Sequence, residues 1–252
     1  MDRDLPLNII LLGASNLSRG YYSLTGCIKK NLDPYPVNFL NAIGPGRAYC
    51  ARGGVFNASY SPIASIPIIS VLEEHGHRDG HIIVLLTDIG NDIAYGTPTE
   101  IIINELGKIV GQFEDVQADI LICPIPSTLN SELTPKVFKT LKAIFFPKSE
   151  VTLYEALNGI QKINQFVNND LRGRVTVING LESYMGWDLI HYGFLNFGKV
   201  WSKIAEEILK TQGISIRKKI SLTQAIPSYM LNMHRVLLAD ILKLTHKSPE
   251  FL

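Results

Sequence analysis

Short apolar runs alternate with amphipathic segments along this chain of 252 residues. Several of the runs are continuously apolar, as expected for strands that are covered on both faces of a parallel sheet. The predicted strands occupy residues 7–12, 37–40, 82–86, 120–125 and 175–178. Helical patterns lie at residues 20–31, 61–75, 99–114, 151–170 and 199–211. Strands that alternate with helices predict right-handed crossovers, and hence a three-layer α/β/α sandwich with a five-stranded parallel sheet.

Two segments lie outside this alternating plan. Residues 127–150 form an insertion after the fourth predicted strand, and residues 214–252 form a tail. The tail carries apolar residues at the spacing of one helical stripe: Ile226, Tyr229, Met230, Met233, Val236, Leu237, Ile241 and Leu244. We therefore expect an α/β domain over residues 1–213 and a helical extension over 214–252. The extension is expected to pack on that domain or at a homodimer interface.

Composition narrows the classes of function. A hydrophobic content of 46% suits one well-filled domain, and a net charge of +1 without a basic block argues against nucleic acid as a partner. Three cysteines without close spacing favour a reducing compartment. The acidic start of the chain is unlike a secretory signal, and no apolar run is long enough to span a membrane. These features together predict a cytoplasmic protein.

Groups able to perform chemistry follow four of the five predicted strands. Ser15 follows the first strand, residues 41–46 the second, residues 90–92 the third, and Asp188 and His191 the fifth. Ligands of open parallel sheets bind beyond the carboxyl ends of the strands, so all these groups are expected at one edge. A hydroxyl, an imidazole and a carboxylate are the nucleophile, the base and the orienting group of a serine hydrolase.

These segments resemble a known family. Gly13-Ala14-Ser15-Asn16, a glycine after the second strand, Gly90-Asn91-Asp92 and Asp188-x-x-His191 are similar, in order and spacing, to the four conserved blocks of the SGNH hydrolases, or GDSL esterase/lipase family. Each block alone is weak, but the four together span roughly residues 7–212. The resemblance implies a flavodoxin-like SGNH hydrolase fold and hydrolysis of a carboxylic ester through an acyl-enzyme. It implies no metal and no organic cofactor.

The resemblance also assigns roles to individual residues. Ser15 would be the nucleophile, His191 the base that takes its proton, and Asp188 the residue that orients the imidazole. The oxyanion would be bound by the backbone N–H of Ser15, the N–H of Gly46 and the side-chain amide of Asn91.

The glycine donor has two candidates. Gly46 is preferred, because the family often places this glycine five residues after an asparagine equivalent to Asn41, and Gly44 is the alternative. Arg47 and Tyr192 are candidate contacts of a small-molecule ester substrate, although Arg47 could equally be a surface charge. One departure from the family is Ala14, which stands where the family usually has aspartate.

Other hypotheses remain open. The same chemistry could transfer an acyl group to an alcohol other than water. Ala14 leaves room for an inactive, ligand-binding domain of the same doubly wound fold. A phosphate-binding module ranks lower, because the loop 13–20 lacks the glycine pattern of such sites. The cluster His75, His77, Asp79 and His81 is predicted to be a solvated loop rather than a metal site, since it precedes the third strand at the opposite edge of the sheet.

Overall fold

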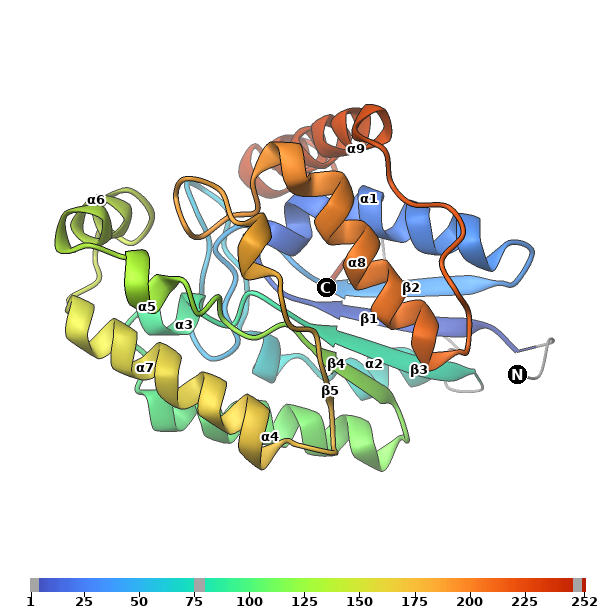
Figure 1. Cartoon of the computed structure of the whole chain (residues 1–252), viewed down its shortest axis with the longest axis horizontal. Coiled ribbons are helices and arrows are strands. Elements are labelled where there is room, and N and C mark those ends of the chain that lie inside the picture. Colours follow the sequence, from blue (N-terminus) through green and yellow to red (C-terminus); the bar gives the residue numbers. More distant parts are fainter. Residues whose placement is uncertain (1–4, 75–79, 247–250) are drawn as a thin grey trace.

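A parallel sheet forms the centre of the computed structural model, which describes residues 5–74, 80–246 and 251–252. The strand order is β2-β1-β3-β4-β5, and every pair of neighbours is parallel (Figure 1). The strands are β1 (Leu7–Leu12), β2 (Val37–Ala42), β3 (His81–Leu86), β4 (Asp119–Ile122) and β5 (Thr176–Val177). The predicted three-layer sandwich with a five-stranded parallel sheet is confirmed.

The interior strand β1 shows why the apolar runs are continuous. Leu7, Ile9 and Leu11 pack into the core on one face of the sheet, whereas Ile10 and Leu12 pack into the core on the other. Successive side chains of a strand point to opposite faces, so a strand that is covered on both sides is apolar at nearly every position. The exception in β1 is the buried Asn8, whose Oδ1 accepts from Asn38 Nδ2 at 3.0 Å. The two helical layers supply that cover.

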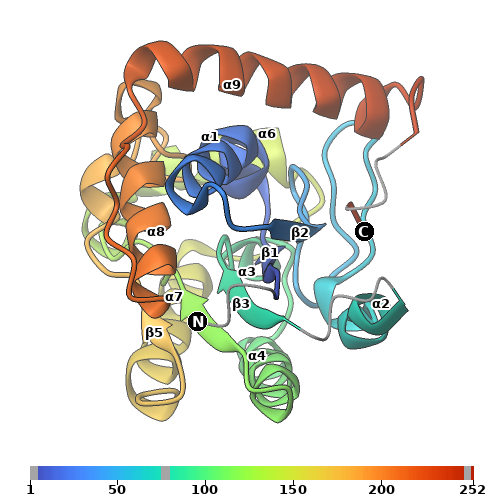
Figure 2. The ribbon, with the colours of Figure 1, turned by 90° about the vertical axis from the view of Figure 1, so that its right-hand side faces the viewer.

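The helices are divided between the two faces of the sheet. The N-terminal helix α1 and helix α8 cover one face, and α2, α4 and α7 cover the other (Figures 1 and 2). The bounds are α1 (Ser15–Leu32), α2 (Ile68–Glu74), α3 (Asn91–Ala94), α4 (Thr99–Asp115), α5 (Leu129–Glu132), α6 (Pro135–Phe145), α7 (Leu153–Gln165), α8 (Phe197–Thr211) and α9 (Leu222–Arg235). None of the helices within the described residues combines the length and the apolar character needed to cross a membrane.

Short helical turns complete the described secondary structure. α7 and α9 continue into the π-helical turns Phe166–Asp170 and Val236–Ile241. Single 3₁₀ turns lie in the loops at Ile63–Ser65, Glu182–Tyr184 and Phe194–Asn196. The predicted helix over 61–75 is thus a 3₁₀ turn followed by α2, because Pro67 interrupts the run between them.

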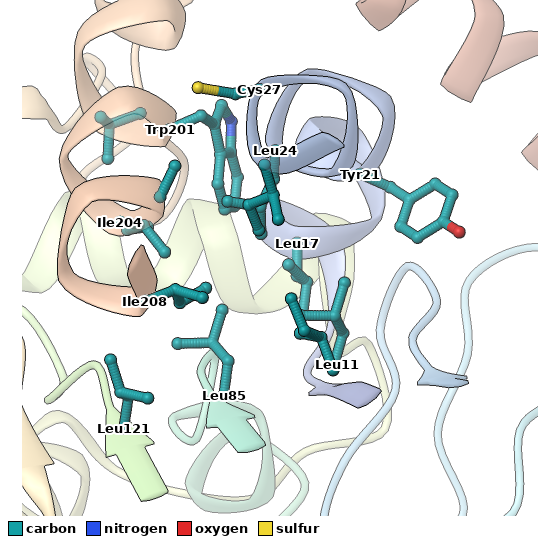
Figure 3. Packing of buried hydrophobic residues seen from close by; sticks show 14 of the residues in the cluster. Leu11, Leu17, Tyr21, Leu24, Cys27, Leu85, Leu121, Trp201, Ile204 and Ile208 are labelled. Atoms are coloured by element: carbon teal, nitrogen blue, oxygen red, sulfur yellow. The ribbon is translucent and has the colours of Figure 1, made fainter. Parts of the chain in front are cut away.

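Helices α1 and α8 approach each other closely where a glycine faces a tryptophan. The Trp201 side chain lies between the two helices, close to α1, and is fully buried (Figure 3). A Cβ atom built at Gly20 would lie 1.8 Å from Cε2 of this ring. Gly20 therefore fixes the distance between α1, which begins at the candidate nucleophile, and α8, which follows the loop that carries the candidate base.

The insertion after β4 is helical. β4 ends at Ile122, earlier than the predicted strand 120–125, because Pro124 and Pro126 lack the N–H groups that a ladder requires. Helix α5 follows, and α6 begins with Thr134 as N-cap and Pro135 at its first position. These two helices lie at the end of the molecule where the carboxyl ends of the strands point (Figure 1).

The C-terminal helix α9 lies on α1 and α8, outside the sandwich (Figure 2). Its contact face includes Asn232, whose Nδ2 donates to the carbonyl of Arg19 at 2.8 Å, and Arg235, which donates to Ser18 Oγ at 3.2 Å. Several members of the apolar stripe predicted in the tail are exposed instead: Ile226, Met230, Met233, Leu237 and Leu244. The face that the helix buries is thus partly polar, which hydrophobic spacing does not reveal.

Candidate active site

The four motif segments meet at the carboxyl edge of the sheet. Ser15 is the first residue of α1, three residues after β1 ends at Leu12. Asn91 is the first residue of α3, in the segment after β3. Asp188 and His191 lie in the loop between β5 and α8. Ser15 and Asn91 are therefore positioned at helix starts that closely follow buried strands, whereas Asp188 and His191 are carried by a longer loop.

The structure brings Ser15, His191 and Asp188 into one chain of hydrogen bonds. The Ser15 hydroxyl lies 2.9 Å from Nε2 of His191, and Nδ1 of the same ring lies 2.7 Å from Oδ2 of Asp188. The other carboxylate oxygen of Asp188 accepts from the backbone N–H groups of His191, at 2.9 Å, and Ile190, at 3.2 Å. The carboxylate is thus fixed by its own loop and in turn orients the ring.

Electrostatics favour an ionised Asp188. Burial by itself would raise the pKa of this carboxyl, but hydrogen bonds from the side chain and backbone of His191 and from the backbone of Ile190 bring the pKa below its ordinary value. An ionised Asp188 accepts the Nδ1–H of the ring, which leaves the lone pair on Nε2 directed at the Ser15 hydroxyl. This arrangement suits removal of the hydroxyl proton.

Asn16 links the serine segment to the histidine loop. Its Nδ2 donates to the carbonyl of Ile190 at 3.0 Å, and its Oδ1 accepts from the backbone N–H of Tyr192 at 2.9 Å. The two backbone groups that flank His191 are therefore held by the residue that follows Ser15. The roles predicted from the sequence did not include Asn16, although its position inside the first motif was a signal.

A second residue absent from the predicted site, Asp88, holds the same segment from the other side. Its Oδ2 accepts from the N–H groups of Ala14, at 2.8 Å, and Leu17, at 3.1 Å, and its Oδ1 accepts from Asn16 Nδ2 at 2.8 Å. Asp88 has φ of 59°, a left-handed conformation that aspartate tolerates better than most residues. The serine loop, which has Ala14 rather than an acidic residue before Ser15, thus receives a carboxylate from the loop after β3.

The candidate oxyanion donor Asn91 is also held from a distant segment. Its Nδ2 donates one hydrogen to the carbonyl of Arg47 at 2.9 Å, and a side-chain amide has a second hydrogen to donate. The neighbouring Asp92 is fully buried. Its carboxylate accepts from three successive backbone N–H groups, those of Tyr49, Cys50 and Ala51, at 2.6 to 2.9 Å. Asp92 thus fastens the loop after β2 to the loop after β3.

Each of the two candidate glycines has its own structural reason to lack a side chain. Gly46 has φ of 74°, which favours glycine, and its carbonyl accepts from the Tyr95 hydroxyl at 2.7 Å. A Cβ at Gly44 would lie 2.3 Å from the Tyr60 ring. The assignment of an oxyanion N–H to Gly46 rather than Gly44 stays a prediction.

The two predicted substrate contacts differ in their positions. Tyr192 lines the pocket beside Ser15. The Arg47 side chain is directed elsewhere: it is only 2% exposed, its guanidinium donates to the carbonyl of Leu252 at 2.7 Å, and it lies over the Tyr60 ring. The prediction that Arg47 contacts substrate, or is a surface charge, is therefore wrong. Its guanidinium is fastened inside the protein, and only its backbone carbonyl reaches the site.

An apolar chamber of about 140 Å³ opens beside Ser15. Its lining combines residues of the motif segments, Ser15, Gly90 and Asn91, with apolar side chains from several parts of the chain. Those side chains are Ile89, Ile93, Ile125, Leu129, Leu133, Phe138, Leu141, Phe146, Ala156, Ile160 and Leu189. Helix α6 also approaches the candidate base directly, because the ring of Phe145 meets the His191 ring edge-on at 5.8 Å between centroids.

The predicted solvated histidine loop lies largely outside the described residues. His75, His77 and Asp79 are not described, and His81 is an exposed residue whose Nε2 lies 2.8 Å from Asp119 Oδ2. Within the described parts of the chain, no three histidine, cysteine or acidic side chains are grouped as they would be around a metal ion.

Comparison with known proteins relates the fold, but not the sequence, to solved structures. No protein-family profile and no curated protein sequence matches the chain. A psychrotrophic esterase of Pseudoalteromonas sp. aligns at 14% identity and a TM-score of 0.47, over 82% of this chain and 98% of its own. A GDSL-like lipase of Bacteroides thetaiotaomicron aligns at 10% identity and a TM-score of 0.48, over 82% and 89%.

A third structure, a member of the lipolytic G-D-S-L family from Veillonella parvula, aligns at 13% identity and a TM-score of 0.39 over 92% of this chain and 96% of its own. Similarity at such identities concerns the fold alone. The structure by itself establishes a three-layer α/β/α sandwich around a five-stranded parallel sheet, with Ser15 and His191 in contact at its carboxyl edge.

Proposed function

We propose that the protein is a serine hydrolase that cleaves a small-molecule carboxylic ester through an acyl-enzyme on Ser15. The observation that carries this proposal is the uninterrupted hydrogen-bonded chain from the Ser15 hydroxyl through His191 to Asp188. A serine at the start of a helix is commonly only a cap. A serine that also contacts an imidazole held by a partly buried carboxylate has the arrangement needed for nucleophilic attack.

In the first half of the reaction, Ser15 Oγ attacks the ester carbonyl carbon while its proton passes to Nε2 of His191. Asp188 stabilises the imidazolium that forms. The negative charge that develops on the carbonyl oxygen is bound by the Ser15 N–H, the second amide hydrogen of Asn91 and the Gly46 N–H. The Ser15 N–H suits this role because the first N–H groups of a helix have no acceptor within the helix.

In the second half, the tetrahedral intermediate collapses and the bond to the alcohol oxygen breaks. The alcohol leaves with the proton that His191 received, and the acyl group remains as an ester of Ser15. Water then attacks this ester as His191 takes one of its protons. Release of the carboxylic acid returns the proton to Ser15 Oγ and regenerates the free enzyme.

Asp88 and Asn16 act in this proposal as positioning residues. Neither touches the reacting atoms. Asp88 holds the backbone on both sides of Ser15, and Asn16 holds the backbone on both sides of His191. Together they support the Ser15–His191 contact despite the alanine at position 14. For this reason the enzyme hypothesis is favoured over an inactive binding domain.

A fluorophosphonate probe tests the proposal directly, since it forms a covalent bond only with an activated serine. We expect labelling of the wild type and of the control variant Ser228→Ala, which removes a half-buried hydroxyl on α9 that donates to the Gln224 carbonyl. The Ser15→Ala variant should not be labelled and should not turn over an aryl ester, while its thermal unfolding stays unchanged. Labelling or turnover by Ser15→Ala would exclude Ser15 as the nucleophile.

The same assay distinguishes hydrolysis from acyl transfer. Addition of a short alcohol to the ester reaction would give a new ester if the acyl-enzyme prefers an acceptor other than water. The proposal expects the free carboxylic acid as the main product at low alcohol concentration. We also propose a cytoplasmic location, which is supported by three free thiols, Cys27, Cys50 and Cys123.

A further inference from the structure

The chamber beside Ser15 is suited to an uncharged, apolar group. Two charged side chains line it, Asp88 and Lys142, and both are engaged by other parts of the protein. Asp88 accepts three hydrogen bonds from the serine segment. Lys142 donates to the carbonyl of Val151 at 2.9 Å and lies over the Phe138 ring. Neither charge is directed to an anionic or cationic ligand, so the lining selects by apolar contact.

The positions of the motif residues indicate which half of an ester enters the chamber. Gly90 and Asn91 line it, and Asn91 is the side-chain donor of the oxyanion site. His191, which must protonate the departing alcohol, is not part of the lining. The alcohol therefore lies on the histidine side of Ser15, and the group attached to the carbonyl carbon, the acyl chain, points into the chamber.

The size of the chamber sets the length of that chain. A dry protein cavity of about 150 Å³ holds benzene, a ligand of six carbon atoms. The chamber here measures about 140 Å³. Resting on the function proposed above, we propose that the enzyme acts on esters of medium-length apolar acids, with a preferred acyl chain of about six carbons.

Helices α6 and α7 determine this length. Leu141 on α6 and Ala156 on α7 both line the chamber and are buried. Removal of three carbons at Leu141 enlarges the space, whereas a larger side chain at position 156 occupies it. Ile144 lies on α6 as well, but it is 64% exposed and does not line the chamber. Ile144→Ala is thus a matched control for truncation at Leu141.

The wild-type enzyme is tested with p-nitrophenyl esters of straight-chain acids from two to fourteen carbons. Each methylene that enters an apolar site contributes about a fourfold gain in kcat/KM. Hexanoyl ester should therefore exceed acetyl ester by on the order of a hundredfold, and values should fall for chains longer than about eight carbons. A maximum at acetyl ester, or equal rates across the series, would overturn the proposal.

The variants test whether the chamber is responsible. Leu141→Ala should move the maximum to acyl chains about two carbons longer, and Ala156→Leu should move it to shorter chains. Ile144→Ala should keep the wild-type profile. Thermal unfolding identifies any variant that fails to fold. If Leu141→Ala does not fold, Leu133→Ala replaces it, and if Ala156→Leu does not fold, Ala94→Leu replaces it. Positions 133 and 94 also line the chamber, and both are only half-buried.

The failure of this proposal can be distinguished from the failure of the proposed function. One outcome is that the probe labels Ser15 but both folded chamber variants keep the wild-type dependence of kcat/KM on acyl-chain length. That outcome would refute the acyl chamber alone. Absence of labelling and of turnover with every ester would refute the ester hydrolase itself. A shift of the profile in opposite directions by the enlarging and the filling variant, with labelling retained, would support both.

Discussion

Replacement of Asp88 by asparagine should impair both stability and catalysis. One oxygen of the Asp88 carboxylate accepts hydrogen bonds from the backbone N–H groups of Ala14 and Leu17, and the other accepts one from the Asn16 side-chain amide. An asparagine at this position has a single acceptor oxygen. If that oxygen keeps the bonds to Ala14 and Leu17, its NH₂ group faces the NH₂ group of Asn16, so the Asn16 amide must turn and release the His191 loop. In the opposite orientation, the two backbone N–H groups lose their acceptor.

Either orientation removes at least one hydrogen bond to a charged group, which contributes about 1.5–3 kcal/mol, and leaves a buried donor unsatisfied at a similar cost. We expect Asp88→Asn to lower the free energy of unfolding by about 3 kcal/mol or more. For a chain of this length, that corresponds to a fall in Tm of about 6–12 °C. A misplacement of about 1 Å between nucleophile and base should lower kcat roughly a hundredfold.

The measurement combines thermal unfolding with ester turnover well below the Tm of the variant, so that all molecules are folded. Asp115→Asn is the matched control, because it changes the same charge at an exposed position at the end of α4. Unchanged Tm and unchanged kcat in Asp88→Asn would refute the role of the carboxylate. A lower Tm with full turnover at low temperature would show that Asp88 stabilises the fold without positioning Ser15.

Three further predictions concern packing, acid stability and thiol reactivity. Gly20→Ala should lower the free energy of unfolding, measured in urea, by about 1–3 kcal/mol, because the added Cβ meets the Trp201 ring. Gly26→Ala on the same helix has open space around the added Cβ and should raise the free energy of unfolding by about 0.5–1 kcal/mol. Because the pKa of Asp188 is lower in the folded than in the unfolded protein, ionisation of this carboxyl stabilises the folded state. The stabilisation is complete above about pH 4 and is lost as the pH falls through the pKa of the folded state. The stability difference between wild type and Asp188→Asn in urea melts should therefore shrink below about pH 4; a constant difference would contradict it. Burial raises the pKa of the thiols to about 11 for Cys27 and to about 12 for Cys50 and Cys123, so native protein should react slowly with a thiol reagent at pH 8 and unfolded protein rapidly.

Local sequence predicted the strands and the edge of the sheet at which the candidate site lies. The run at 7–12 coincides with β1, and the helix predicted at 99–114 is one residue shorter than α4. Both succeed because burial on two faces, or on one helical face, imposes a period on the sequence itself. The strand at 120–125 was predicted too long, since apolar residues continue past the point where proline ends the ladder.

The candidate residues Ser15, Asp188 and His191 could be named from sequence, because their short motifs follow strands at a common edge. Their supporting residues could not. Asp88 contacts a segment more than seventy positions away, and Asn16 contacts one more than 170 positions away. Nothing in the sequence indicates which distant N–H groups donate hydrogen bonds to a carboxylate that follows a strand.

The tertiary structure alone decided the role of Arg47 and the shape of the acyl chamber. The sequence around Arg47 does not distinguish a guanidinium that faces a substrate from one that is buried and donates to the Leu252 carbonyl. The chamber is enclosed by side chains from α3, α6, α7 and several loops, each of which reads locally as ordinary core. Periodicity along the chain records whether a residue is buried. Which partners it is buried against depends on how segments distant in sequence meet, and that is fixed only when the whole chain has folded.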